Sequence, residues 1–165
     1  MRALAMTGMV LFSLAMLAGS CNAQQVIVLD GLGGLASRNL QPEVNRLTNL
    51  GYDVTYRPWW RWRNAARVAP NASRVIGYSM GGPRAIRVTS RTNASQLELL
   101  DPFSRTPMIA PPGTATTVYR AAGPTVIRST PVYGNFQQYQ LPTNHAGIPG
   151  AVSYTHLTLP TKRIV

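Results

Sequence analysis

The pentapeptide from Gly77 to Gly81 holds the residue best suited to covalent chemistry. Its sequence, Gly-Tyr-Ser-Met-Gly, places Ser79 between two glycines at two-residue spacing, after an apolar run and before small residues that can begin a helix. A strand that turns sharply into a helix presents such a serine at the helix N-terminus, and only neighbours without bulk tolerate that turn. The pattern predicts a nucleophilic serine. The alternative is a tight strand–helix turn without chemistry.

A serine hydroxyl needs a general base and an orienting acid to attack a carbonyl. His145 is the only histidine between residues 24 and 151. Asp101 ends the apolar run that follows the predicted helix after Ser79, so we expect its carboxylate at the same edge of the sheet as the serine. We therefore predict a triad of Ser79, His145 and Asp101. The alternatives are a turn aspartate before Pro102 and an ordinary polar loop histidine.

A glycine-rich loop follows the first apolar run, beginning at Asp30. In a site that stabilises a tetrahedral oxyanion, the backbone N–H of Leu32 or Gly33 would act beside that of Met80. The same loop, over residues 31–36, also fits the G-x-G-x-x-A fingerprint of dinucleotide-binding proteins, in which Arg57 would meet a 2′-phosphate. The oxyanion loop is the reading we favour, and dinucleotide binding is the less favoured alternative.

These residues can meet only if the strands that precede them end at the same edge of one sheet. Apolar runs typical of buried strands alternate with amphipathic stretches, which predicts a mainly parallel sheet with crossover helices on both faces, an α/β fold, minimal and without a cap domain. The predicted strands are 25–30, 53–57, 74–77 and 96–100, and the predicted helices are 38–50, a short one within 58–69, and 82–91. Further strands are plausible at 116–120, 125–128 and 136–141.

The two ends of the chain differ from its middle. Residues 1–23 have a basic start, an apolar run and a small-residue exit, which predicts a secretory signal peptide and a secreted or periplasmic protein. A membrane anchor and a lipoprotein site at Cys21 are alternatives. Residues 152–165 resemble a translated sequencing adapter, so we expect a non-native tail there and assign His156 no role. The remaining region, 24–151, is long enough for one α/β domain.

Charge is the strongest compositional feature. The chain has 16 lysines and arginines, 5 acidic residues and a formal net charge of +11. Such an excess favours anionic surfaces, although arginines dispersed along the chain also describe an ordinary solvated surface. The only cysteine lies in the predicted signal peptide, so no disulfide is expected in the domain. With one histidine and scattered carboxylates, no metal site and no cofactor are predicted, and no nucleic-acid partner is expected.

A cluster of tryptophans and arginines begins at Pro58. It includes Trp59 and Trp60, which follow a strand at the edge where Ser79 is expected, and we predict that they line an acyl pocket together with Tyr78. Aromatic rings mixed with guanidinium groups also suit a membrane interface or a polyanion. A non-catalytic binding module for such a surface is therefore the alternative to an enzyme.

Taken together, the glycine loop, the serine turn, the strand end at Asp101-Pro102 and the late Asn144-His145 resemble the small lipase- or thioesterase-like α/β-hydrolases of bacteria. The resemblance covers most of residues 25–150. It implies a serine esterase that cleaves a small-molecule or lipid ester, or a thioester, with Ser79, Asp101 and His145 as the catalytic residues. Asp30 departs from the pattern, because many lipases carry histidine at that place. A helix would normally follow the histidine, where the predicted tail begins.

Overall fold

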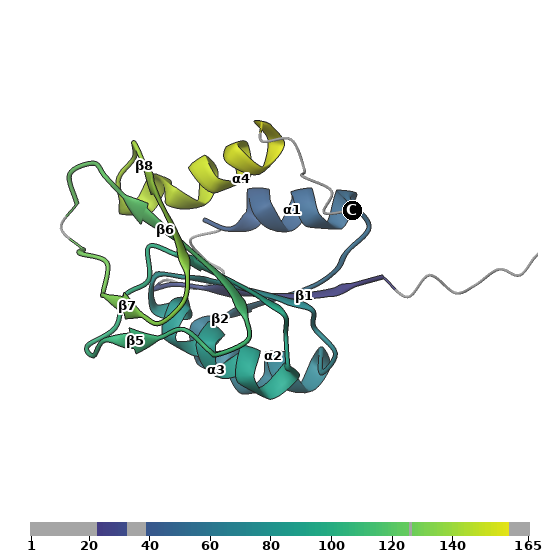
Figure 1. Cartoon of the computed structure of the whole chain (residues 1–165). Helices are drawn as coiled ribbons and strands as arrows, with labels where there is room; N and C mark the ends of the chain where they lie inside the picture. The colour runs from purple at the N-terminus through teal and green to yellow at the C-terminus, as the bar shows by residue number, and fades with distance from the viewer. Residues whose placement is uncertain (1–22, 33–38, 126, 159–165) are drawn as a thin grey trace, which may run out of the picture.

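The computed structural model describes residues 23–32, 39–125 and 127–158. A six-stranded sheet forms the centre, with the order β2-β1-β3-β4-β6-β8, and every neighbouring pair of strands is parallel. Parallel neighbours require crossover connections, and the first three are supplied by helices (Figure 1). The α/β fold with a parallel sheet, predicted from the alternation of apolar runs and amphipathic stretches, is confirmed.

The strands and helices are short and regular. The strands of the main sheet are β1 (Gln25–Asp30), β2 (Asp53–Pro58), β3 (Arg74–Tyr78), β4 (Gln96–Leu100), β6 (Ala115–Ala121) and β8 (Gln137–Leu141). The helices are α1 (Gln41–Asn49), α2 (Trp62–Val68), α3 (Gly82–Thr92) and α4 (Ile148–Thr158). A separate parallel pair consists of β5 (Met108–Ile109) and β7 (Val132–Tyr133).

Two apolar layers cover the sheet, one on each face. Helices α1 and α4 lie above the sheet in Figure 1, and α2 and α3 lie below it. Alternate residues of each strand point to opposite faces. Val26 and Val28 of β1 therefore belong to the core under α1 and α4, whereas Ile27 and Leu29 belong to the core over α2 and α3. All four are fully buried, which explains why β1 is a continuous apolar run.

The second half of the domain departs from the expectation. The strand predicted at 125–128 is wrong: Thr125 forms a local turn with Ile127, whose backbone N–H donates to the Thr125 hydroxyl at 3.2 Å. Both sides of β6 are paired, with β4 and with β8, so the segment cannot join the sheet beside β6. The short β5–β7 pair was not predicted. The strands expected at 116–120 and 136–141 correspond to β6 and β8.

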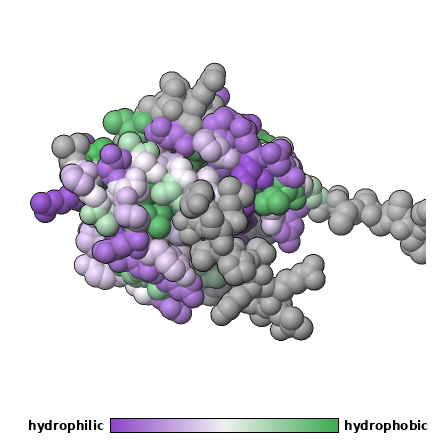
Figure 2. Space-filling view, turned by 90° about the horizontal axis from the view of Figure 1, so that it is seen from above, coloured by the Kyte–Doolittle hydropathy of each residue, from purple (hydrophilic) through white to green (hydrophobic). Residues whose placement is uncertain are grey.

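Helix α4 crosses residue 151, where the sequence analysis ends the domain. Val152 is 1% exposed in the core under α1 and α4, and Ser153 is 7% exposed, with its hydroxyl 3.1 Å from an Oε2 acceptor on Glu43. Packing therefore continues past the predicted boundary, and a helix does follow the late histidine. Seen from above, this side of the molecule mixes hydrophilic and hydrophobic residues (Figure 2). No helix within the described residues is long and apolar enough to cross a bilayer.

Candidate active site

Ser79 stands at the sharp turn between β3 and α3. Its φ is +51°, in the left-handed region that residues with a side chain rarely adopt. The flanking glycines make the turn possible. A Cβ on Gly77 would lie 2.5 Å from the Cβ of Ala85, and one on Gly81 would collide with the carbonyl oxygen of Leu29. The spacing of the two glycines thus follows from the close approach of α3 and β1 to the turn.

The turn lies where the strand order of the sheet reverses. Chain connections run from β1 outward to β2, and then from β3 outward in the other direction. In open α/β sheets, the crevice at the carboxyl ends of the two strands flanking this reversal is the usual ligand site. Gly31 follows β1 and Ser79 follows β3, so both lie at the carboxyl ends of the two strands that flank the reversal. A Cβ on Gly31 would be 2.8 Å from the Cβ of Ser79, which shows how closely the loop passes the serine.

A continuous hydrogen-bonded chain joins the three predicted catalytic residues. The Oγ of Ser79 is 3.0 Å from Nε2 of His145, and Nδ1 of His145 is 2.6 Å from Oδ2 of Asp101. An ionised carboxylate can only accept, so Nδ1 carries the proton and Nε2 is left as the acceptor for the serine hydroxyl. Ser79, His145 and Asp101 are 3%, 8% and 1% exposed. The arrangement can move a proton from the hydroxyl to the imidazole and stabilise the resulting cation.

The backbone of Asp101, like that of Ser79, is in the left-handed region, and it is fixed by hydrogen bonds to β6. It follows β4 with a φ of +42°. Its N–H donates to the Tyr119 carbonyl at 2.7 Å, and its Oδ1 accepts the N–H of Ala121 at 3.3 Å. These contacts with β6 leave Oδ2 for the histidine. Burial lowers the pKa of the neighbouring Arg120, while the negative charge of Asp101 acts in the opposite direction.

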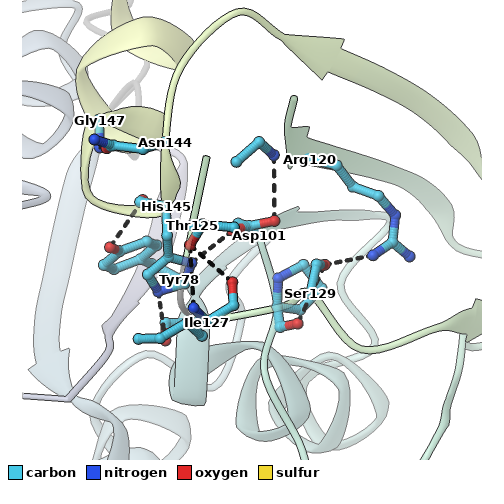
Figure 3. Close-up of polar contacts among 12 residues, drawn as sticks. Tyr78, Asp101, Arg120, Thr125, Ile127, Ser129, Asn144, His145 and Gly147 are labelled. Atoms are coloured by element: carbon cyan, nitrogen blue, oxygen red, sulfur yellow. Dashed lines mark hydrogen bonds and ion pairs between the residues drawn. The ribbon is translucent and has the colours of Figure 1, made fainter. Parts of the chain in front are cut away.

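His145 begins a short 3-10 turn that leads into α4. Asn144 caps this turn by accepting the N–H of Gly147 on its side-chain oxygen at 2.9 Å. Tyr78 stacks against the imidazole, with ring centroids 5.0 Å apart, and its hydroxyl donates to the His145 carbonyl at 3.1 Å (Figure 3). Burial, with the charges of Asp30 and Asp101, raises the pKa of Tyr78 to about 12, so the hydroxyl stays a donor at neutral pH.

The predicted oxyanion residues are described in part. Met80 directly follows Ser79 in the 3-10 turn Ser79–Gly81, and the first N–H groups of such a turn have no partner within it. Leu32 follows Gly31 and is 70% exposed. Gly33 lies outside the described residues.

A buried carboxylate supports the start of this loop. Asp30, fully buried, accepts the Gly31 N–H at 2.7 Å and a short hydrogen bond from the Tyr56 hydroxyl. Burial and this hydrogen bond raise the pKa of Tyr56. Sequence reasoning missed both Tyr56 and the support of His145 by Tyr78. A usable signal existed, because Tyr56 pairs with Val28, two residues before Asp30, and two-residue spacing places both side chains on the same face of the sheet.

The three residues predicted to line an acyl pocket lie in two different places. Tyr78 is buried behind the histidine, as described above. Trp59 forms an edge-to-face pair with Trp60 and lies under the guanidinium of Arg84, 5.6 Å from its ring centre, and Trp60 is 53% exposed. Arg57, the residue of the dinucleotide alternative, donates to the Tyr56 carbonyl at 2.7 Å. The described parts of the chain contain no cluster of three or more metal-ligating side chains.

Among the comparisons with known proteins, the one with solved structures supports the fold. No family model and no curated protein matches the chain. The crystal structure of a "putative hydrolase of the alpha/beta superfamily" from Xanthomonas campestris pv. campestris is similar at a TM-score of 0.59 and 13% identity, over 82% of this chain and 99% of that one. The crystal structure of a "predicted CIB-like hydrolase" from Thermoplasma acidophilum is similar at a TM-score of 0.54 and 11% identity, over 84% of this chain and 86% of that one. The chain therefore has a small α/β fold like that of these two structures, and no cap is evident among its described residues.

Proposed function

We propose that this protein is a serine hydrolase that cleaves an ester or thioester through an acyl-enzyme. The observation that carries the proposal is the buried chain from Ser79 Oγ to His145 Nε2 and from His145 Nδ1 to Asp101 Oδ2, with lengths of 3.0 and 2.6 Å. Support comes also from the left-handed backbone at Ser79, because strain of this kind is retained where it serves reactivity.

The reaction would proceed in two steps. Ser79 Oγ attacks the carbonyl carbon while His145 Nε2 takes its proton, and the N–H groups of Met80 and Leu32 donate to the developing oxyanion. The tetrahedral intermediate expels the alcohol or thiol, which receives the proton from His145. Water then attacks the acyl-serine with His145 as base, which releases the acid and restores the hydroxyl. Asp101 keeps the imidazole oriented and stabilises its cation.

The substrate is proposed only as a class. Trp59 and Trp60 follow β2 at the edge of the sheet that carries Ser79, so they are our candidates for contact with an acyl chain. Trp59→Ala should then raise KM for long acyl chains more than for acetyl esters. A chain-length profile identical to that of the parent protein would remove Trp59 from the pocket. Secretion or export to the periplasm remains a prediction from residues 1–23.

The first experiment measures the nucleophile without knowing the substrate. A fluorophosphonate probe reacts covalently with an activated serine, so the full chain should be labelled once, at Ser79, and should hydrolyse p-nitrophenyl or thioester substrates of graded length. Ser79→Ala should abolish both. Ser90→Ala, which removes an exposed hydroxyl that donates to the Ile86 carbonyl at 3.3 Å, is the matched control and should retain both. A folded protein that neither reacts nor hydrolyses would contradict the proposal.

A further inference from the structure

The charges of this protein are segregated between the two faces of the sheet. The layer under the sheet carries six arginines and no acidic residue: Arg61, Arg63, Arg67, Arg84, Arg87 and Arg91. Helices α2 and α3 pack side by side there (Figure 1). Residues three and four apart share one side of a helix, so Arg84, Arg87 and Arg91 form one stripe on α3, and Arg63 and Arg67 form another on α2. We call these six residues the arginine surface.

The acidic residues of the chain are placed where they cannot neutralise this surface. Three of the five, Asp30, Glu43 and Asp101, are at most 1% exposed. Glu98 is paired with Arg74 at 2.5 Å and alternates with Leu97 and Leu99, which face α2 and α3, so it points to the opposite face. Asp53 is exposed, but it begins β2 at the edge of the sheet away from Ser79.

Three guanidinium groups gather around one indole. The guanidinium carbons of Arg63, Arg87 and Arg91 lie 5.1, 6.0 and 4.6 Å from the ring centre of Trp62, which is 6% exposed. The three positive charges repel one another. An anion that binds between them would offset this repulsion and so stabilise the packing of the three arginines around Trp62. A guanidinium group that packs on an aromatic ring can still donate from its N–H edges, in the fork that matches phosphate oxygens.

An exposed tryptophan adjoins the arginine surface. Trp60 precedes Arg61, is 53% exposed and contacts Trp59, which in turn lies under Arg84. Tryptophan rings beside cationic side chains are typical of surfaces that rest at the headgroup level of a bilayer. A nucleic acid also offers phosphates, but single-strand binding proteins stack successive bases on several aromatic side chains along a groove, whereas Trp60 is the one exposed tryptophan beside this surface. The aromatic neighbour therefore favours lipid.

We propose that the arginine surface docks on a bilayer of anionic phospholipid, with guanidinium groups of α2 and α3 on lipid phosphates and Trp60 at headgroup depth. The proposal does not depend on the chemistry of Ser79. Docking is testable in a protein that hydrolyses nothing, and hydrolysis is testable without vesicles. If both are correct, the docked layer also brings the edge of the sheet with Ser79 close to the lipid, because α3 begins three residues after the serine.

Sedimentation with lipid vesicles tests the docking directly. The full chain should bind vesicles of phosphatidylglycerol and phosphatidylcholine and should bind pure phosphatidylcholine weakly. The neutral vesicles also measure any binding through the apolar residues 9–18. Binding to the anionic vesicles should fall steeply as salt is added, because the Debye length decreases to about 8 Å near physiological ionic strength. Equal binding to both kinds of vesicle would overturn the proposal.

Two pairs of substitutions with the same change of charge locate the surface. Arg87→Gln with Arg91→Gln should weaken binding about 25-fold, at roughly fivefold for each arginine. Arg105→Gln with Arg128→Gln removes two exposed arginines outside the arginine surface and should weaken it by about twofold. Urea unfolding of each protein verifies that the fold is retained. Equal weakening by the two pairs would overturn the proposal.

A third pair separates charge from packing. Arg87→Lys with Arg91→Lys keeps both charges while changing the contacts with Trp62, so most of the binding should remain. If this pair binds as weakly as the glutamine pair, the arginines act by packing and the docking proposal is wrong. The proposal is equally wrong if the chain is retained by heparin or a single-stranded oligonucleotide and ignores anionic vesicles, because the partner is then a soluble polyanion.

Discussion

Tyr78 stacks on the imidazole of His145, with centroids 5.0 Å apart, and donates its hydroxyl proton to the His145 carbonyl at 3.1 Å. The residue directly before the proposed nucleophile thus also holds the proposed base. The two residues are far apart in sequence, and this contact ties the 3-10 turn of His145 to the end of β3. The position of the base is therefore coupled to the position of the serine.

Tyr78→Phe keeps the ring and removes the hydroxyl. We expect a loss of about 1 kcal/mol in the free energy of unfolding, because the carbonyl of His145 loses a buried donor. We also expect kcat to fall by roughly tenfold as the imidazole loses its anchor. Urea unfolding and ester kinetics measure the two effects. Tyr133→Phe, at an exposed tyrosine, is the control, and equal behaviour of the two variants would refute the anchoring role.

Asp101→Asn tests the orienting acid with minimal change of shape. Asparagine tolerates the left-handed backbone at this position, so the fold should be retained. An amide in place of the carboxylate stabilises the wrong tautomer of His145, and kcat should fall by roughly 10³ to 10⁴. Asp53→Asn, at an exposed position outside the site, should leave kcat unchanged. A loss below tenfold at Asp101 would assign the acid role to another group.

Gly81→Ala tests the steric origin of the serine turn. The new Cβ would collide with the backbone carbonyl of Leu29, which cannot move without disturbing β1. We expect a destabilisation of about 3 kcal/mol, seen as a lower urea midpoint. Gly150→Ala is the control, because a Cβ there meets nothing within 4 Å. If both substitutions shift the midpoint equally, the close approach at Gly81 does not constrain the fold.

The protein should lose stability in alkali. Burial raises the pKa of Tyr78 from 10.0 to about 12 and also raises those of Tyr56 and Tyr119. The unfolded chain therefore releases these protons first, so the stability is complete below pH 10 and falls as the pH rises toward 12. Urea midpoints at several pH values measure this fall. Tyr78→Phe should make it less steep, and an unchanged slope would show that Tyr78 does not contribute.

The end of the packed domain is tested by two changes. Ser153→Ala removes a buried hydroxyl that bonds Glu43 or the Pro149 carbonyl, at 3.1 and 3.0 Å, and should cost about 1 kcal/mol. Ending the chain at residue 151 also removes the buried Val152 and should cost about 3 kcal/mol or more. A chain shortened after Thr158 keeps α4 as described and is the control. Equal midpoints for all forms would place residues 152 and 153 outside the cooperative unit.

Much of the first half of the fold was predictable because burial on both faces leaves a clear pattern. The apolar runs 25–30 and 74–77 correspond closely to β1 and β3, and the place of the serine between β3 and α3 follows from the glycine spacing together with the apolar run before it and the small residues after it. Asp101 and His145 could be chosen as candidates from the sequence, since the domain offers few acidic residues and one histidine. Their hydrogen bonds were not predictable, because they depend on the backbone at Asp101 and on a helix that follows His145.

The second half was less predictable for physical reasons. The β5 and β7 strands have two residues each, too few for a period-two pattern to emerge. A strand at 125–128 was plausible from the sequence, but strand propensity does not show that β8 takes the place beside β6. Helix α4 was missed because the resemblance of residues 152–165 to adapter sequence removed them from consideration, and that origin remains a prediction.

The left-handed backbone at Ser79 and Asp101 has a consequence for how this protein would change over generations. Each of these conformations costs on the order of 1–3 kcal/mol, which glycine would recover. A lineage released from selection for chemistry would gain thermal tolerance by drifting to glycine at either position. If the proposed hydrolysis is what selection maintains, serine and aspartate should persist together at these two positions among descendants, and a descendant without the activity should be free to lose both.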